Sequence, residues 1–350
     1  MPVFGPRELK KHVLDQGLCV GCGACAELCP YLRIHNGRMA MLFDCDLERG
    51  SCYAHCPKTG EDPPGQAPGK TDREALGHPL GNHRRIIAAR KGRRLKNGGF
   101  QAGGTVSALT ISALEDGIIK QAVLTDRQGP APLPRIVFAA DEVLSCAGSK
   151  YMTAPTLSAL NLALSRGMRQ IGVVATPCQT TGLAKLRSNP LGKDAFLDPV
   201  SLVIGLFCTW ALDPLGFTEL LHEMLPDQEV IKMDITPPPQ EMMIIDTKKG
   251  RTRIPLDRLR SLVPAGCSIC PDMTAEQADV SVGVIETRPD WNLVIVRSEQ
   301  GQELVERACS KGLLQTGSVA AETIQHLQSA ALNKKQRALQ KTCPETGGAL

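Results

Sequence analysis

Fourteen cysteines are the residues of this 350-residue chain whose type and spacing predict chemistry. The first four form the run CVGCGACAELCP, from Cys19 to Pro30. Two-residue spacings that end in Cys-Pro are the ligand pattern of bacterial [4Fe-4S] ferredoxins, in which the last cysteine of the run binds the other cluster of a pair. A zinc knuckle is the alternative, but four cysteines this close before a proline favour an iron–sulfur cluster.

The cysteines after this run are less regular. Cys52 and Cys56, the latter before a proline, reproduce the end of a second ferredoxin run, but only Cys45 precedes them where a complete run has two more cysteines. The spacing therefore supplies one cluster with four thiolates and a second cluster with three. The ligands predicted for the first cluster are Cys19, Cys22, Cys25 and Cys56. The ligands predicted for the second are Cys29, Cys45 and Cys52.

Three outcomes stay open for the second cluster. It is a three-iron cluster, a four-iron cluster with one ligand that is not cysteine, or it is absent. The candidates for a ligand other than cysteine are Asp44, Asp46 and His55. We favour an occupied site, because three cysteines at these spacings have no simpler explanation.

Four more cysteines lie far apart in the sequence but in informative places. Cys178, in ATPCQ, and Cys208, in LFCT, each follow a predicted buried strand, while Cys267 and Cys270 form a CxxC pair before a proline. The carboxyl ends of neighbouring strands in an open α/β sheet face one ligand crevice. These four cysteines are therefore predicted to hold a third [4Fe-4S] cluster. The alternative is that Cys178 and Cys208 are small buried apolar residues.

The rest of the composition is that of an ordinary globular protein, with 42% hydrophobic residues and a net charge of +4. A mild charge and 3% aromatic residues favour no nucleic-acid surface. The N-terminal residues lack the apolar core of a secretory signal, and the longest apolar stretch, residues 200–212, is too short to span a bilayer. We therefore expect a cytoplasmic protein, and clustered cysteines in that compartment indicate metal or redox chemistry.

Length and pattern predict a small ferredoxin-like iron–sulfur module followed by a larger α/β domain. The module is expected at residues 1–60, a linker at 61–96 and the larger domain at 97–345. The linker begins with EDPPGQAPGK and continues into a basic run over residues 83–96. We interpret that run as a solvated helix face; the alternative is a docking surface for an acidic cofactor or partner.

Within the larger domain, strands that alternate with helices predict an α/β core with a mainly parallel sheet. A hairpin is expected over residues 241–256, and two helices end the chain. The other expected helices lie within residues 101–117, 156–167, 178–188 and 213–225. The expected strands lie within residues 119–126, 135–141, 169–177, 199–208, 278–285 and 291–298.

The order of several motifs resembles a known family. The motifs are QAGGTVSALTISALEDG, AGSKY, VVATPCQTTGLAKL, the strand end LFC, GCSICPDMTAEQADVSVG and WNLVIVRSEQGQEL. Over about residues 97–340 they resemble the beta subunits of coenzyme F420-reducing hydrogenase and F420-dependent dehydrogenases, for which an N-terminal ferredoxin module is a common companion. The resemblance implies an iron–sulfur flavoprotein whose larger domain binds FAD beside a [4Fe-4S] cluster.

The resemblance also points to residues that contact the flavin. Glycines before a helix let backbone amides approach a phosphate, and the AGSKY motif offers a hydroxyl, a cation and an aromatic ring. The predicted cofactor-binding residues are Gly103, Gly104, Thr105, Ser149, Lys150, Tyr151, Thr176 and Gln179. Lys150 is also the predicted catalytic residue, as the cation that stabilises an anionic reduced flavin.

Two departures from the family pattern leave the hydride donor open. Ala102 stands where the family has serine, and Val284 stands where an acidic residue is common. The predicted function is an oxidoreductase subunit in which hydride moves between coenzyme F420, or a similar carrier, and FAD, while clusters pass single electrons to ferredoxin or to other redox subunits of a hetero-oligomeric complex. A flavin-free electron relay is the alternative, and a regulatory protein with structural zinc is a third reading.

Overall fold

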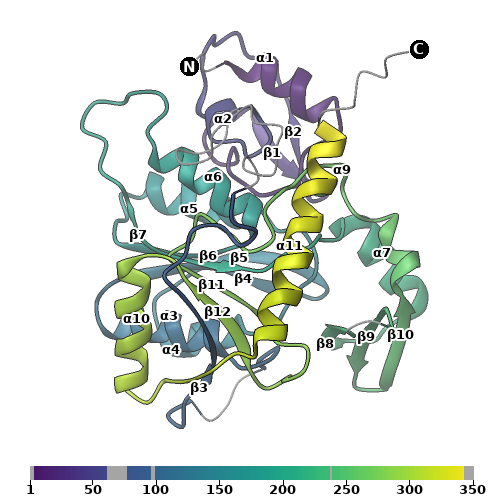
Figure 1. Cartoon of the computed structure of the whole chain (residues 1–350). Helices are drawn as coiled ribbons and strands as arrows, with labels where there is room; N and C mark the ends of the chain where they lie inside the picture. Colours follow the sequence, from purple (N-terminus) through teal and green to yellow (C-terminus); the bar gives the residue numbers. More distant parts are fainter. Residues whose placement is uncertain (1–3, 61–76, 96–98, 237–238, 343–350) are drawn as a thin grey trace, which may run out of the picture.

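An eight-stranded sheet forms the centre of the protein in a computed structural model that describes residues 4–60, 77–95, 99–236 and 239–342 (Figure 1). The order of its strands is β13-β3-β12-β11-β7-β6-β4-β5. In that order the strands are Leu314–Gly317, Arg85–Lys91, Asn292–Val296, Val280–Val284, Val200–Leu206, Ile171–Ala175, Gln121–Gln128 and Ala131–Val137. The six strands predicted from the sequence are all present.

The prediction of a mainly parallel sheet is wrong. Strands β11, β7, β6 and β4 are parallel neighbours, but β5 on one side and β12, β3 and β13 on the other pair antiparallel. The four parallel strands alternate with helical crossovers, whereas β5 and β12 each follow the preceding strand through a loop and β13 follows helix α10. Pattern matching detects the strands but not the direction in which they pair.

Helices cover both faces of this sheet. Helices α3 (Thr105–Glu115), α4 (Ala140–Ser145) and α10 (Glu299–Ser310) pack in one apolar core on one face. Helices α5 (Thr156–Ser165) and α6 (Pro177–Arg187) pack on the other. Alternation along β7 divides its side chains between the two cores, as expected for a strand buried on both faces.

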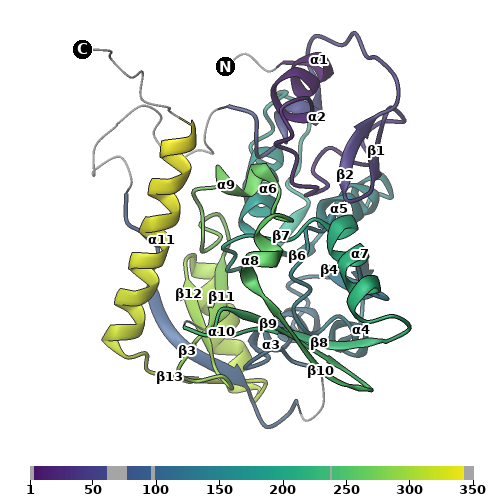
Figure 2. The same cartoon turned by 90° about the vertical axis from the view of Figure 1, so that its right-hand side faces the viewer.

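The C-terminal helix α11 (Ala321–Thr342) runs along one side of the sheet (Figures 1 and 2). It packs on β3 and β12 through Ala331 and contacts the short helix α9 (Ala265–Ser268). No helix among the described residues is long and apolar enough to cross a membrane.

A second, three-stranded sheet lies beside the main one (Figures 1 and 2). It contains the predicted hairpin, β9 (Met242–Thr247) with β10 (Gly250–Pro255), and one further strand, β8 (Val230–Ile235). Helix α7 (Pro214–Met224) and helix α8 (Leu256–Arg260) close its separate apolar core. This unit is inserted between β7 and β11, so it leaves the parallel pairing of those strands intact.

The N-terminal module is small and rich in cysteine. It has the helical turns α1 (Pro6–Leu9) and α2 (Ser51–Ala54), a π-helical turn at Lys10–Leu14 and a hairpin of β1 (Leu32–His35) with β2 (Arg38–Met41). Cysteines make up much of its interior. The module packs against α5 and α6 at one edge of the large domain (Figure 1).

The prediction of a linker over residues 61–96 is wrong for the part of the basic run that the structure describes. Arg85–Lys91 is strand β3, which pairs with β12 and β13 inside the main sheet. Ala88 and Ala89 are buried in the cores on the two faces of the sheet, while Arg85 is exposed and Arg90 is half-buried, so the run reads as solvated although it is a strand. Residues 61–76, with the Pro/Gly-rich segment, and residues 343–345 lie outside the described residues.

Candidate iron–sulfur and cofactor sites

Four cysteines of the N-terminal module line one cavity, and we call them the central group. They are Cys19, Cys22, Cys25 and Cys56. The loop that carries the first three depends on glycine, because Gly21 and Gly23 have positive φ angles of 60° and 84°. A Cβ at Gly21 would lie 2.0 Å from the carbonyl oxygen of Gly37. The backbone therefore closes around the cavity in a way that other residues do not allow.

Backbone amides point at the sulfur atoms of this group. The amides of Gly21 and Met39 each donate to Cys19 Sγ at 3.5 Å, and the amide of Lys58 donates to Cys56 Sγ at 3.4 Å. Burial, and then neighbouring thiols, raise the pKa of Cys22 and Cys25 well above its usual value. Buried thiolates at such positions need a compensating cation, and bound iron supplies one.

Cys29, Cys45 and Cys52 form a second set, the distal group. Burial raises the pKa of Cys52 to about 11, and the thiols of Cys29 and Cys45 add to that shift, so the three lie together. His55, a candidate for the fourth ligand, has a buried Nδ1 without a partner among the described residues. Burial, and then the charges of Lys193 and Lys185, lower the pKa of His55 to about 4. Its role as a ligand of the distal group stays a prediction.

The other two candidates for a fourth ligand stay where the sequence puts them. Asp44 and Asp46 flank Cys45 in an exposed loop. Either carboxylate remains available to the distal group.

The third set, the sheet-edge group, comes from three separate loops. Its members are Cys178, Cys208, Cys267 and Cys270. Cys178 lies in the first turn of α6, where Thr176 caps the helix, and Cys208 follows β7. Burial raises the pKa of Cys178 to about 11, and the thiols of Cys270 and Cys267 add to that shift. The carboxyl edge of the sheet therefore gathers these four sulfur atoms.

Close packing holds the loop with the CxxC pair against the end of β7. A Cβ at Gly205 would lie 2.4 Å from the Cβ of Ala275, so this glycine is needed for the approach. The amide of Cys208 donates to the carbonyl of Met273 at 2.9 Å. Burial raises the pKa of Cys208 to about 12, the charge of Lys334 opposes that shift, and the other three thiols of the group add to it.

The three groups follow one another in space. Cys22 of the central group lies in one apolar cluster with Cys178 and Cys267 of the sheet-edge group. Cys25 and Cys56 of the central group lie in another cluster with Cys52 and Cys29 of the distal group. The order is therefore distal, central, sheet-edge.

Within each group, the sulfur atoms lie near one another but do not converge on one position. In the part of the chain that the structure describes, no three His, Cys, Asp or Glu side chains converge closely enough for a single metal ion. Tetrahedral zinc needs four ligands at short bonds to one atom, whereas each thiolate of a [4Fe-4S] cluster binds a different iron. The arrangement fits clusters better than zinc.

The glycine pair predicted to contact a phosphate lies at the start of α3. Gly104 has a φ of 71°, and a Cβ at Gly103 would lie 2.7 Å from Asn292 Oδ1. Thr105 is fully buried, and its hydroxyl donates to the carbonyl of Ala89 at 3.1 Å. Its amide donates to Asn292 Oδ1 at 3.3 Å. The Thr105 side chain is therefore bonded inside the protein, and its role as a cofactor contact stays a prediction.

The residues of the AGSKY segment form hydrogen bonds with different parts of the protein. Ser149 is exposed, and its amide donates to Gln101 Oε1 at 3.3 Å, which ties the segment to the start of α3. The hydroxyl of Tyr151 donates to Asp234 Oδ1 at 3.3 Å, on strand β8. Lys150 Nζ donates to the carbonyls of Cys146, Ala147 and Gly148, at 2.5, 3.4 and 2.8 Å. All three ammonium donors of Lys150 are thus directed at backbone.

Thr176 and Gln179 form the N-cap of α6. The side chain of Gln179 accepts from the amide of Thr176 at 2.8 Å and donates to the carbonyl of Ala154 and to Thr156 Oγ1. Gln179 is 3% exposed, and its role as a flavin contact stays a prediction. Thr176 Oγ1 lies 3.4 Å from Cys178 Sγ and belongs to the sheet-edge group instead.

Sequence reasoning missed the buried polar residues that fasten the cysteine loops. Asn161 Nδ2 donates to the carbonyls of Gly23, Ala24 and Ala26, and Lys185 Nζ donates to those of Cys56 and Thr59. Both residues come from helices of the large domain. Their positions in polar turns of amphipathic helices carry no signal of burial in the sequence.

The fold and the cysteine groups define an iron–sulfur protein built on a mixed α/β domain. Family models agree. The 4Fe-4S binding domain matches residues 12–32, and the N-terminal and C-terminal models of the coenzyme F420 hydrogenase/dehydrogenase beta subunit match residues 86–161 and 168–322. The chain belongs to this beta subunit family.

Curated relatives agree with this assignment. The chain is 30% identical to the coenzyme F420 hydrogenase subunit beta of Methanothermobacter thermautotrophicus over 74% of this chain and 94% of the relative. It is 28% identical to the coenzyme F420-dependent sulfite reductase of Methanocaldococcus jannaschii, over 84% of this chain and 46% of that protein. A chain in the structure of the F420-reducing [NiFe] hydrogenase complex of Methanosarcina barkeri has the same fold, with a TM-score of 0.67, 24% identity and coverage of 75% of this chain and 93% of that one.

Proposed function

We propose that the protein is an iron–sulfur flavoprotein subunit that exchanges hydride with a soluble carrier and single electrons with a redox partner. The observation that carries the proposal is the continuous order of the distal, central and sheet-edge groups, seen in the clusters that their cysteines share. Such an order suits stepwise electron transfer between the interior of the sheet and the surface of the module. Bound FAD would supply the change between two-electron and one-electron chemistry.

The start of α3 supports a site for the FAD phosphates. Among the described residues, the amides of Val106 and Ser107 donate to no group, and the ring of Phe100 packs beside Gly104, where a Cβ would come within 3.0 Å of it. Exposed Ser149 is tied to this turn through Gln101. Free amides at a helix N-terminus bind phosphate well. Gly103, Gly104, Ser149 and Tyr151 remain our proposed contacts.

Lys150 would act through its charge. Burial lowers its pKa to about 8, so its ammonium loses a proton as the pH rises through about 8. We expect reduction of the flavin by a hydride donor to slow over this pH range in the wild type. In Lys150→Ala the rate should be lower and independent of pH in the same range, while exposed Lys120→Ala serves as the control. Stopped-flow absorbance measures both; unchanged flavin content and kinetics in Lys150→Ala would exclude this role.

A flavin-free electron relay is the second candidate. The observation in its favour is that Thr105 and Gln179, two of the predicted flavin contacts, are occupied inside the protein. The relay would keep all three clusters but would exchange electrons only with one-electron donors.

The test is the anaerobic purification of the full chain with analysis of iron, sulfide, flavin and zinc. Three clusters require about eleven or twelve iron atoms per chain, and two require about eight. The proposal expects FAD and reduction by reduced coenzyme F420 or by NAD(P)H. Clusters without flavin, reduced by ferredoxin alone, would favour the relay. A colourless zinc protein would contradict both.

A further inference from the structure

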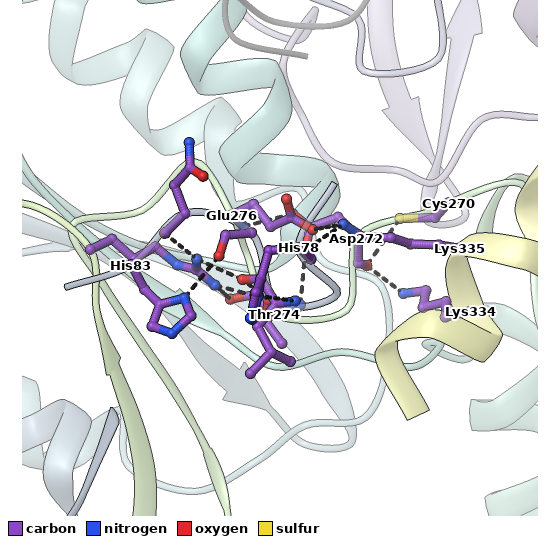
Figure 3. A network of polar contacts seen from close by, with 12 residues as sticks. His78, His83, Cys270, Asp272, Thr274, Glu276, Lys334 and Lys335 are labelled. Atoms are coloured by element: carbon purple, nitrogen blue, oxygen red, sulfur yellow. Dashed lines mark hydrogen bonds and ion pairs between the residues drawn. The ribbon is translucent and has the colours of Figure 1, made fainter. Parts of the chain in front are cut away.

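Lys334 is a buried lysine of α11 whose ammonium reaches the sheet-edge group. Its side chain is 3% exposed. Its Nζ donates to the carbonyl oxygen of Cys208 at 2.6 Å and to that of Asp272 at 2.7 Å (Figure 3). The second contact lies two residues beyond Cys270, whose sulfur donates to the same carbonyl at 3.5 Å. One ammonium group therefore joins two of the loops that carry these cysteines.

No carboxylate balances this charge. Among the described residues, none lies within ion-pair distance of Lys334. The next residue on the helix has an ion-pair partner. Lys335 Nζ lies 2.8 Å from Glu276 Oε1, and both side chains are nearly as buried as that of Lys334. A buried cation without an anion is costly, so a lysine kept in this position indicates negative charge nearby.

The neighbouring carboxylates are held away from Lys334. Both oxygens of Asp272 accept from backbone amides, of Thr274 at 2.9 Å and of Glu276 at 2.8 Å. Arg297 is turned toward Ser281, Thr274 and the carbonyl of Leu80. This network appears beside Lys334 in Figure 3. Its charges are engaged with one another, which leaves the sheet-edge thiols as the remaining source of negative charge near Lys334 in the part of the chain that the structure describes.

Electrostatics agree with this placement. The charge of Lys334 opposes the burial that raises the pKa of Cys208, and it also opposes the burial that raises the pKa of Cys267. Four thiolates bound to a [4Fe-4S] cluster leave the whole assembly negative, and one-electron reduction makes it more so. A fixed cation therefore stabilises the reduced state more than the oxidised state.

We infer that Lys334 is the counter-charge of a [4Fe-4S] cluster bound by Cys178, Cys208, Cys267 and Cys270, and that it raises the reduction potential of this cluster relative to a site without it. This inference rests on the proposed function, since it requires that cluster. Lys334 is a positioning residue: it acts on the cluster through charge and through the two carbonyls it holds. The sheet-edge cluster thereby becomes the better electron acceptor.

The test is an EPR-monitored redox titration of the full protein. Lys334→Gln removes the charge but keeps a hydrogen-bond donor, and Lys334→Arg keeps the charge. The matched control is the double variant Lys335→Gln, Glu276→Gln, which removes a neighbouring buried cation together with its anion. Cys208→Ala in the wild-type background assigns the signal of the sheet-edge cluster. Iron content is measured for each protein.

We expect the Gln variant to need a lower potential for half-reduction of this cluster alone. At the wild-type midpoint its ratio of reduced to oxidised cluster should fall about tenfold, which is about 59 mV for one electron. The Arg variant and the double variant should stay near the wild type. If the Gln variant loses this cluster while the Arg variant still contains it, that result also supports the inference.

Two results would overturn it. If the Gln variant contains the cluster and its midpoint is unshifted, the role of Lys334 is contradicted but the proposed function is not. The same holds if the Gln and the Arg variants both lose the cluster, because Lys334 would then be structural. Absence of a signal that Cys208→Ala removes from the wild type is a different result. It contradicts the proposed sheet-edge cluster and, with it, the role of Lys334.

Discussion

The central group and the sheet-edge group each gather four cysteines, but they do so in opposite ways. Three of the central cysteines lie within one short loop, Cys19 to Cys25, whose glycines shape the cavity. The sheet-edge cysteines come from three loops that the main sheet and α11 hold in place. A loop that surrounds its metal depends on that metal for its fold, whereas a framework with its own apolar core does not.

The two groups also share one structural feature. A buried lysine from a helix of the large domain donates to the carbonyl of one cysteine in each group, Lys185 to Cys56 and Lys334 to Cys208. Each lysine thus fastens a cysteine loop to a helix outside that loop. The central group is thereby tied to the large domain, and the module is a part of one body with it.

The largest difference between the groups should appear when one ligand is removed. We expect Cys22→Ala to unfold the module and to lose both of its clusters, about seven or eight iron atoms, because the apolar core of the module is small and includes five of its cysteines. Iron analysis and limited proteolysis of the module measure this. Retention of a protease-resistant, iron-loaded module would mean that the two groups do not differ in this way.

Cys208→Ala should have the smaller structural effect of the two. We expect a loss of about four iron atoms with the apolar cores of the large domain intact, because the sheet does not need the cluster to fold. Thermal unfolding should stay close to that of the wild type, while reduction of the module clusters through the flavin should stop. A collapse of the large domain in this variant would contradict the comparison.

Lys185→Met tests the fastening of the central group. The variant leaves the carbonyls of Cys56 and Thr59 without their charged donor inside a buried contact. We expect a loss of about 2 kcal/mol in the free energy of unfolding, from hydrogen bonds to a charged group. Chemical denaturation measures it, and Lys120→Met, at an exposed position, is the control. An unchanged midpoint of unfolding would show that the lysine does not fasten the module.

The smallest effect on stability should come from the apolar residues beside the distal group. Leu42 and Phe43 are 53% and 65% exposed, and Phe43 packs edge-on against Tyr31 at 5.9 Å. They precede Cys45 in the chain, so a redox protein that exchanges electrons with the distal group is expected to contact them. We expect Leu42→Ser, Phe43→Ser to change stability by less than about 0.5 kcal/mol.

The same double variant should slow reduction of a bacterial two-cluster ferredoxin at least several-fold without changing reduction of the protein's own clusters. Leu197→Ser, an equally exposed change remote in sequence from the distal group, is the control. Stopped-flow mixing of the reduced protein with oxidised ferredoxin measures the rate. Equal rates in the wild type and both variants would remove this surface from the electron path.

Much of the fold follows from local pattern. Buried strands such as β6 and β7 are short apolar runs between glycine, proline and polar turns, and the sequence identifies them directly. The pattern of residues 85–91 predicts a linker, because basic residues stand at both ends of a short apolar stretch. Its burial depends on pairing with β12 and β13, which lie more than two hundred residues later.

The sequence by itself determined which cysteines belong to a ferredoxin run, because their spacing is fixed by the geometry of one loop around one cluster. It also determined the family, because the motif order extends over the whole larger domain. Only the tertiary structure decided the order of the three groups, the internal use of Thr105 and Gln179, and the placement of Lys334 beside Cys208. Burial of a polar side chain depends on residues far away in the chain, and no local pattern records it.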